Sequence, residues 1–313
     1  MNASYLFRLI CLSLAAFFIV NLMAGAVMAW TSSVAIRFAG RIRAESAARF
    51  LFAMRIAPAA LALLIVIFLC VPSYLWLEPV AGTEQISGIC FAAALAALTL
   101  WVRSTIQSWR AVIKSRRYLE TCRQMGEPTL LAGQTAFVVP AGPTTALAGL
   151  FHPVLLISRD VVSALSADQI EAAVLHERAH SASRDNLKRL AMLLAPVIFP
   201  LRRLERAWRT YAEFAADDRA VAGDPHRSLA LAEALVRVAR MGESPRLSPL
   251  TTSLLGDDIS SRVDRLLNDR VPDSCETDYS WSPIVIASAL VAALLLRPST
   301  FDLVHSALER LIH

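Results

Sequence analysis

Charged residues are scarce in this chain of 313 residues. Asp, Glu, Lys and Arg together make up 18% of the sequence, whereas hydrophobic residues make up 56%. A soluble domain usually carries about 25% charged residues, because its surface must stay hydrated. The shortage of charge argues against an ordinary soluble protein and makes residence in a membrane the first hypothesis to test.

Cysteines are also few, and their spacing in the sequence does not arrange them in pairs. The five cysteines, at positions 11, 70, 90, 122 and 275, lie mostly within apolar stretches and show no CxxC spacing. Neither a disulfide framework nor a zinc site built from thiolates is indicated. The chain also lacks internal repeats and low-complexity linkers.

Four apolar stretches account for the excess of hydrophobic residues. A bilayer core of about 30 Å takes about 20 helical residues to cross. Leu9–Trp30 and Ile56–Leu77 meet this length, and Ile86–Val102 and Tyr279–Leu296 lie near its short limit. We therefore expect four transmembrane helices. The alternative for the first stretch is a cleaved signal peptide, but its apolar run is longer than a signal core.

The connecting segments differ in charge, and this difference predicts the orientation. Five arginines lie between the first two stretches and five basic residues follow the third, whereas the loop between the second and third carries only Glu78 and Glu84. Short basic loops stay on the cytoplasmic side. We expect a bacterial inner-membrane protein with both termini outside and residues 103–278 in the cytoplasm. The same placement explains the net charge of +5 without a nucleic-acid partner.

The chain divides into three predicted regions. Residues 1–109 form a three-helix transmembrane region, residues 110–278 a cytoplasmic domain, and residues 279–313 the fourth span with a short amphipathic tail. In the cytoplasmic domain, apolar runs at 135–139 and 154–157 are separated by glycines and prolines, which predicts a small sheet. The expected fold class is a mainly α membrane protein with an α+β cytoplasmic domain.

A helix with a clear start follows the predicted sheet. Residues 166–169 form an S-x-x-Q capping box, in which both side chains satisfy backbone donors at a helix start. We expect this helix to run to about Leu193, and another to cover about 203–222. The apolar segment Leu190–Leu201 contains two prolines and is too short to cross a bilayer. It is either a buried core segment or one that dips into the membrane surface.

The first of these helices carries the motif His176-Glu177-Arg178-Ala179-His180. Residues four apart on a helix face the same way, so His176 and His180 can bind one metal ion with Glu177 beside its open position. Zinc lowers the pKa of bound water towards about 7, and a neighbouring carboxylate can take the proton and deliver it to the leaving amine. The pattern predicts zinc-dependent hydrolysis. The alternative is an amphipathic helix that carries two histidines at this spacing without a metal.

A catalytic zinc site needs a third protein ligand and an open fourth position. The metzincin pattern requires Gly at 183 and His at 186, where this chain has Ser183 and Asn186. The expected third ligand is instead Glu213, on the downstream helix. Asp217, one turn further on, is expected to hydrogen-bond the outer nitrogen of a ligand histidine. Asp217 and Asp218 are the alternative ligands.

Three further side chains lie near these motifs in the sequence. His152 and His226 could donate hydrogen bonds to a transition state, although each also fits an ordinary loop histidine. Tyr211 could donate to an oxyanion, but only its closeness to Glu213 supports that role. None of the three is included in the predicted site.

In these motifs and in the order of its elements, the chain resembles the antirepressor metallopeptidases, the membrane family that includes the bacterial β-lactam sensor-transducers. The matching parts are residues 149–153 with the strand after them, 174–180, 184–186, Glu213 and Asp217. The resemblance implies a gluzincin-type site in which His176, His180 and Glu213 bind zinc. It also implies Glu177 as the catalytic base and Asp217 as the residue that supports a ligand histidine.

The chain departs from that family in two places. Arg178 stands where such helices usually carry an apolar residue. Only a short segment follows Leu296, and no S-x-x-K acylation motif is present, so an outer penicillin-binding sensor domain is not expected. Direct sensing of β-lactams is therefore not supported.

The expected function is an integral-membrane zinc endopeptidase in signalling. Its partners would be the lipid bilayer and a cytoplasmic or membrane-proximal protein substrate, either a transcriptional repressor or the chain itself. Residues 154–157 are expected to hold the substrate as an added strand, because cleavage requires an extended backbone beside the zinc. Two alternatives remain: a non-catalytic membrane receptor or scaffold with a metalloprotease fold, and a housekeeping protease for membrane-protein quality control.

Overall fold

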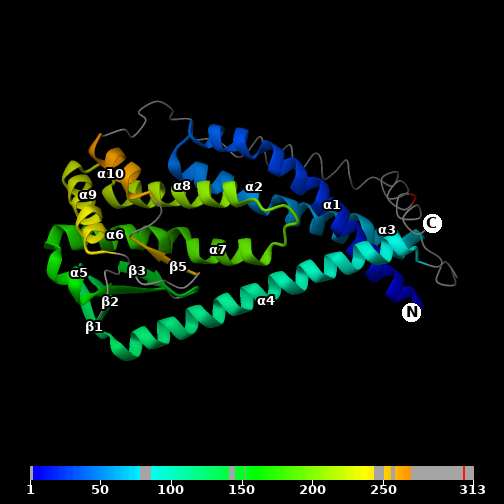
Figure 1. The fold of residues 1–313 in the computed structure, drawn as a ribbon, viewed down its shortest axis with the longest axis horizontal. Helices are drawn as coiled ribbons and strands as arrows, with labels where there is room; N and C mark the ends of the chain where they lie inside the picture. The colour runs from blue at the N-terminus through cyan, green and yellow to red at the C-terminus, as the bar shows by residue number, and fades with distance from the viewer. Residues whose placement is uncertain are drawn as a thin grey trace.

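The computed structural model describes most of the chain up to residue 268 (Figure 1). The described ranges are 3–77, 86–140, 145–151, 153–242, 250–254 and 258–268, together with residue 306. Four features expected from the sequence lie outside the described residues: the fourth span at 279–296, the tail at 301–312 apart from residue 306, the acidic loop at 78–84, and His152.

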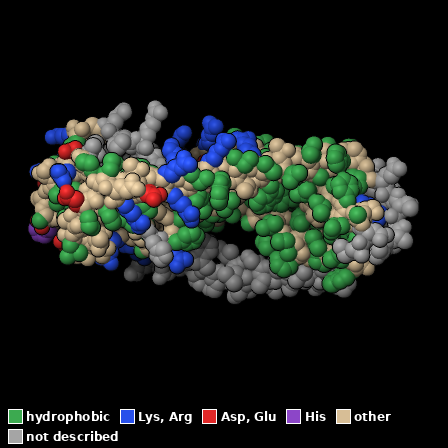
Figure 2. Space-filling model, turned by 90° about the horizontal axis from the view of Figure 1, so that it is seen from below, with side chains coloured by type: hydrophobic (Ala, Val, Ile, Leu, Met, Phe, Trp, Pro, Cys, Tyr) green, Lys and Arg blue, Asp and Glu red, His purple; other side chains and the backbone are tan. Residues whose placement is uncertain are grey.

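Within the described residues, three helical segments are long and apolar enough to cross a membrane. They are α1 (Ala3–Ala39), the segment Ala44–Leu77, which joins α2 (Ala44–Ile65), the π-helical turn η1 (Val66–Cys70) and α3 (Val71–Leu77), and α4 (Gly88–Met125). Hydrophobic side chains cover the end of the molecule that these helices form (Figure 2). By length and composition, the first three predicted spans are confirmed.

The second span changes its helical winding once, beside a proline. The π-helical turn η1 ends at Cys70, and Val71 donates its backbone N–H to Val66 O, five residues back. Pro72 follows directly, lacks a backbone N–H, and would clash with the carbonyl four residues before it in a regular α-helix. The wider turn accommodates this proline, so the helix continues to Leu77 without a break.

The third span continues far beyond its apolar part. The sequence predicts a span at 86–102 and a separate basic helix that ends near Met125, but α4 is a single helix of 38 residues. At about 1.5 Å per residue it is roughly 57 Å long, about twice the thickness of a bilayer core. It therefore reaches from the hydrophobic end of the molecule to the sheet (Figure 1). A Cβ at Gly126 would lie 2.6 Å from Cys122 O, so the tight turn out of α4 requires glycine.

A five-stranded mixed sheet lies at the other end of α4, in the order β1-β2-β4-β3-β5. Its strands are β1 (Glu127–Leu131), β2 (Gln134–Val139), β3 (Thr145–Ala148), β4 (Val154–Ser158) and β5 (Thr251–Ser253). Strands β2 and β4 pair in parallel, and the other neighbours pair antiparallel. The small sheet predicted from the runs at 135–139 and 154–157 is confirmed.

The expected role of 154–157 as the strand that takes up a substrate is wrong. Strand β4 pairs with β2 along one edge and with β3 along the other, so both of its edges are occupied. The sequence did not indicate β3, which lies among the glycines and prolines, or β5, which comes from about a hundred residues further along. The edge strands of this sheet are β1 and β5.

Six helices complete the described part of this region. They are α5 (Arg159–Ala164), α6 (Ala167–Ser183), α7 (Asp185–Leu194), α8 (Arg202–Val221), α9 (Pro225–Arg240) and α10 (Ile259–Leu267). The capping box is confirmed, with Ser166 Oγ accepting from Gln169 N and Gln169 Oε1 accepting from Ser166 N. Apolar side chains of the sheet, α6, α9 and α10 share one core.

The helix expected to run to Leu193 is in fact interrupted. It ends at Ser183, and Arg184 adopts a left-handed conformation with φ of 53° before α7 begins. Such a conformation costs a non-glycine residue of order 1–3 kcal/mol. Hydrogen bonds of the next two side chains offset this cost: Asp185 bonds to His180, and Asn186 Nδ2 donates to the carbonyls of Leu147 and Gly149.

Helix α8 packs lengthwise against α2, so one helix joins the membrane part to the sheet-containing part (Figure 1). Leu51, Leu204 and Trp208 are almost fully buried in the shared core. The proline-rich segment before α8 also packs inward, since Asn21 Nδ2 on α1 donates to Pro196 O over 3.0 Å. Because Asn21 lies within the first apolar stretch, this contact fits both interpretations of 190–201, a buried core segment and one that enters the membrane surface.

Candidate metal centre

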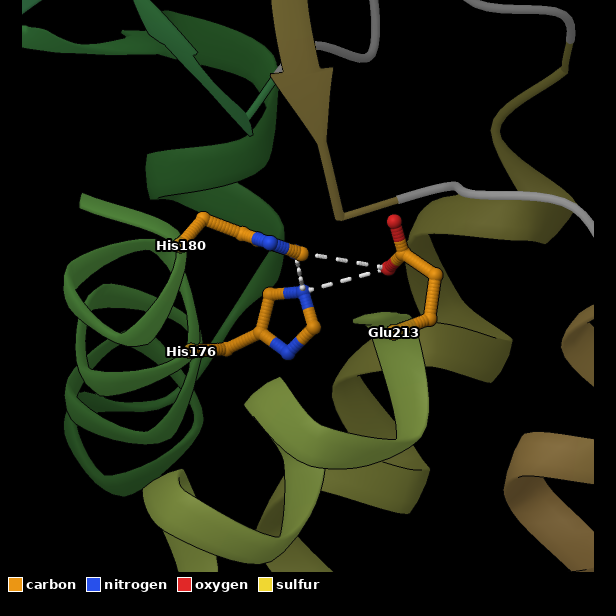
Figure 3. A group of neighbouring side chains, drawn as sticks. All are labelled: His176, His180 and Glu213. Atoms are coloured by element: carbon orange, nitrogen blue, oxygen red, sulfur yellow. Dashed lines mark hydrogen bonds and ion pairs between the residues drawn. The ribbon is translucent and has the colours of Figure 1, made fainter. Parts of the chain in front are cut away.

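Two histidines on α6 form one side of the candidate metal centre (Figure 3). His176 and His180 lie one turn apart and are 0% and 1% exposed. Their Nε2 atoms are 3.2 Å apart, and the rings meet edge to face. The capping box fixes where α6 begins, and the four-residue spacing then directs both rings to the same side.

Helix α8 supplies the third group. Glu213 Oε2 lies 3.4 Å from His176 Nε2 and 3.6 Å from His180 Nε2, and Glu213 is 3% exposed. Helices α6 and α8 pack directly against each other. The buried residues beside the ligands, Ala179 on α6 and Ala216 on α8, are small and permit a close approach of the two helices. The two motifs, separate in sequence, therefore meet.

The triangle of ligand atoms has the size that a small tetrahedral ion requires. Zinc binds nitrogen and oxygen at about 2.0–2.2 Å, which sets tetrahedral ligands about 3.3–3.6 Å apart. The three observed separations are 3.2, 3.4 and 3.6 Å. Glu213 Oε2 is buried and forms no hydrogen bond of good geometry among the described residues; its near neighbours are the two histidine Nε2 atoms and, at 3.2 Å, Arg262 Nη1. The group His176, His180 and Glu213 could therefore hold a metal ion.

Glu177 lies beside these ligands in an unusual environment for a carboxyl group. It is 0% exposed, and both its carboxylate oxygens lack a hydrogen-bond partner among the described residues. Burial raises the pKa of Glu177, an effect that the neighbouring His176 and His180 partly oppose. A buried carboxyl group of this kind can take up a proton and release it again. Its role as the catalytic base stays a prediction.

Asp217 supports the first histidine. Its Oδ1 lies 2.8 Å from His176 Nδ1, the ring nitrogen that faces away from Glu213. A carboxylate in this position fixes the tautomer, so that Nε2 presents its lone pair to a metal. Although burial opposes ionisation, Arg262 and His176 together lower the pKa of Asp217. The structure thus places Asp217 where the sequence predicted it.

Asp185 supports the second histidine and was missed in the sequence. Its Oδ2 lies 2.7 Å from His180 Nδ1, and its Oδ1 accepts from Lys188 Nζ over 2.9 Å. On a continuous helix, a residue five positions after His180 would point elsewhere. The left-handed turn at Arg184 redirects Asp185 towards the ring. The family resemblance pointed to 184–186 but gave Asp185 no role.

Arg262, from α10, is the other residue that the sequence did not reveal. It is 1% exposed, with Nε 2.8 Å from Asp217 Oδ2 and Nη2 2.6 Å from Asp217 Oδ1. Its Nη1 lies 3.2 Å from Glu213 Oε2 and donates to Leu254 O. This guanidinium neutralises two buried carboxylates from α8. No local motif marks it, because its partners lie far away in the chain.

The buried histidines and carboxylates at this centre shift one another's pKa. Burial and Arg262 lower the pKa of His176, but Asp217 and Glu213 raise it more. Burial also lowers the pKa of His180, yet Glu213 and Asp185 raise it to about 10. Burial raises the pKa of Glu213, whereas His180 and Arg262 hold it well below its ordinary range. Protons on the imidazoles thus balance the carboxylates, and a metal ion would replace those protons.

The other candidates from the sequence do not join the ligands. Asp218, an alternative ligand, pairs instead with Arg265, at 2.7 Å. Tyr211 places its hydroxyl oxygen against Gly40, at 3.2 Å from where a Cβ would lie. His226 is exposed at the start of α9, and His152 lies outside the described residues.

A cavity of about 450 Å³ adjoins the centre on the side of His180. Its other walls come from the turn between β3 and β4, including Leu150 and Phe151, and from Asn186. Its walls are mixed: Leu147, Leu150, Phe151, Pro153 and Leu187 are apolar, and the groups from Ser181 and from 184–186 are polar. It offers space for a side chain next to the ligand histidine.

Comparison with models of protein families gives no match, and comparison with curated proteins gives none either. The metal centre is therefore interpreted from its own geometry: two histidines from α6, a carboxylate from α8, and a buried carboxyl group beside them.

Proposed function

We propose that this protein is an integral-membrane zinc endopeptidase that uses Glu177 as its catalytic base. The observation that carries the proposal is the combination of a zinc-sized ligand triangle with an unpaired, fully buried Glu177 beside it. Structural zinc sites are closed by four protein ligands, whereas a site with three leaves a position for water. Three ligands with an adjacent base are the arrangement of a hydrolase.

Each residue of the centre would have a separate role in hydrolysis of the peptide bond. Bound zinc would polarise the scissile carbonyl and acidify a water molecule. Glu177 would take the proton from that water and pass it to the departing amine. Asp217 and Asp185 each hold the Nδ1 proton of one ligand histidine, which keeps both Nε2 lone pairs directed at the metal.

The substrate that we propose is a protein held close to the membrane. The three membrane-capable helices keep the site near the bilayer, and the cavity beside His180 can receive an apolar side chain. The basic loops next to the spans support a bacterial inner-membrane location with the site in the cytoplasm. The resemblance to antirepressor metallopeptidases favours a repressor, or the chain itself, as the protein cut in signalling.

One observation favours a second candidate function. His176, Glu177 and His180 are at most 1% exposed, so a peptide cannot reach them unless the surrounding elements move. A non-catalytic membrane receptor that retains the metalloprotease fold would keep such a closed, metal-stabilised core. This candidate predicts bound metal without any cleavage.

A single substitution separates the two candidates. We expect purified wild-type protein in lipid nanodiscs to bind about one zinc per chain and to cleave denatured casein or itself. Glu177→Gln should retain zinc and lose cleavage by about 100-fold or more, since general-base catalysis contributes 10²–10⁴-fold. Glu171→Gln is the matched control, because Glu171 lies on the same helix and is exposed. Equal cleavage by both variants, or none by zinc-loaded wild type, would reject the endopeptidase.

A further inference from the structure

A second cavity, of about 600 Å³, lies away from the metal ligands and is lined by arginines. It is enclosed by α2, α4, α7 and the start of α8. Its charged lining residues are Arg55, Arg103, Arg189, Arg202, Arg209 and Glu205. Five arginines and one acid line the cavity among the described residues, so its lining is rich in guanidinium groups, although Arg189 and Arg209 also have other partners. A ligand that fills it must be anionic.

The cavity is at the edge of the apolar layer. Arg55 directly precedes the apolar stretch of the second span, and Arg103 is the first charged residue after the apolar stretch of α4. Lys and Arg side chains gather at the boundary between the hydrophobic end and the remainder of the molecule (Figure 2). Lipid headgroups lie at this depth when the three helices cross a bilayer.

Arg55 provides an independent sign that a ligand belongs there. It is 4% exposed, with Nε 2.6 Å from Glu205 Oε1 and Nη2 2.8 Å from Met192 O. Its Nη1 is buried and has no hydrogen-bond partner among the described residues. A buried N–H without an acceptor is unfavourable. An oxygen of a phosphate group would satisfy it, since guanidinium groups bind phosphate well.

Apart from the charged residues and the polar Ser104 and Gln107, the cavity wall is apolar. Leu100 on α4 and Val197, Ile198 and Leu201 before α8 line it. Apolar walls next to an arginine cluster fit a molecule with a phosphate at one end and hydrocarbon next to it. This combination favours a phospholipid over a free phosphate ion.

We propose that this cavity binds the phosphate headgroup of an anionic phospholipid. Basic pockets between transmembrane helices recognise such headgroups by charge and by hydrogen bonds to phosphate. The bound lipid would contact α2, α4 and the first turn of α8, the helix that also carries Glu213 further along. This inference does not depend on whether the metal centre is catalytic.

The test uses a double variant and a control of equal charge. Arg103→Gln with Arg202→Gln removes two exposed arginines of the cavity and leaves the ion pair between Arg55 and Glu205 intact. Arg110→Gln with Arg203→Gln removes two exposed arginines from the same two helices that do not line the cavity. Binding of phosphatidylglycerol, phosphatidylcholine and inorganic phosphate to the detergent-solubilised full chain is measured by native mass spectrometry.

We expect wild type and the control to bind phosphatidylglycerol one to one, more tightly than phosphatidylcholine. The cavity variant should bind it about tenfold more weakly or worse, because each arginine contributes to anionic-lipid binding. Equal losses in both double variants, or equal binding of the two lipids, would overturn the proposal. Inorganic phosphate binding as tightly as the lipid would also overturn it and identify a free anion as the ligand. If the double variant does not fold, Arg103→Gln is compared with Arg110→Gln.

Discussion

The two ligand histidines lie one turn apart on the same helix, but they are supported in different ways. His180 is oriented by Asp185, five residues on in the chain, with Lys188 behind it. His176 is oriented by Asp217 on α8, which Arg262 on α10 holds in turn. One support is local and comes from the first residue of α7, whereas the other exists only when α6, α8 and α10 have packed together. We therefore expect a loss of helix packing to disturb the support of His176 more than the support of His180.

The largest effect on zinc binding is expected for Glu213, which faces the two histidines from α8. We predict that Glu213→Gln reduces bound zinc from about one per chain to nearly none, because two imidazoles alone do not make a strong zinc site. Metal content after dialysis, measured by mass spectrometry, checks this. Glu171→Gln, on the exposed face of α6, should keep its zinc. Stoichiometric zinc in the Glu213 variant would rule out this ligand set.

Arg262 tests the non-local support. Arg262→Gln would leave Glu213 and Asp217 as buried carboxylates without their guanidinium partner. We expect the metal-free protein to lose about 3–5 kcal/mol of stability, as when one member of a buried ion pair is removed. Thermal unfolding with and without zinc measures the loss, and zinc should restore part of it.

Arg265 supplies the matched comparison for Arg262. It lies on the same helix and pairs with the partly exposed Asp218. Arg265→Gln should cost less than about 1 kcal/mol. Similar losses of stability for Arg262→Gln and Arg265→Gln would contradict the prediction that the buried ion pairs behind His176 stabilise the fold more than a partly exposed pair does.

The two supporting carboxylates can be compared directly. Asp217→Asn and Asp185→Asn should each weaken zinc binding by about 10–100-fold, the usual effect of losing a carboxylate behind a ligand histidine. We expect the larger loss for Asp217, because it also anchors Arg262. Competition with a zinc chelator gives both affinities. A larger loss of zinc affinity in Asp185→Asn than in Asp217→Asn would contradict this prediction.

The smallest expected effect is a pH dependence at His180. Burial lowers its pKa, but Glu213 and Asp185 raise it from 6.5 to about 10. A raised pKa means that the protonated imidazole stabilises the metal-free fold fully below pH 6.5, and that this stabilisation disappears as the pH rises towards 10. Zinc must displace the proton, so zinc affinity should rise across the same interval. Calorimetry at pH 8 in two buffers should show at least about one proton released per zinc, because the pKa of His176 is raised as well, and no release would contradict this prediction.

The sequence predicted the parts of the molecule that depend on local patterns. Three membrane helices, the capping box of α6, the positions of His176 and His180, and the presence of a sheet follow from runs, caps and spacing. Pairing of strands does not follow from such patterns, because it depends on which segments meet. The role assigned to β4 was wrong for this reason, since β3 and β2 occupy its two edges.

The candidate site shows the same division. Glu213 and Asp217 were recognised because their four-residue spacing matches the turn between the two histidines. Asp185 was not, because its side chain reaches His180 only through the left-handed residue Arg184. Arg262 could not be predicted from the sequence, because its role is to neutralise two carboxylates on another helix and no local pattern marks that contact.

Zinc X-ray absorption spectroscopy of the full-length protein tests the central claim most directly. The geometry predicts a first shell of nitrogen and oxygen at about 2.0–2.2 Å, with two imidazoles in wild type and one fewer in His180→Ala. Zinc bound through sulfur at about 2.3 Å, or a spectrum unchanged by that substitution, would show that the metal binds elsewhere.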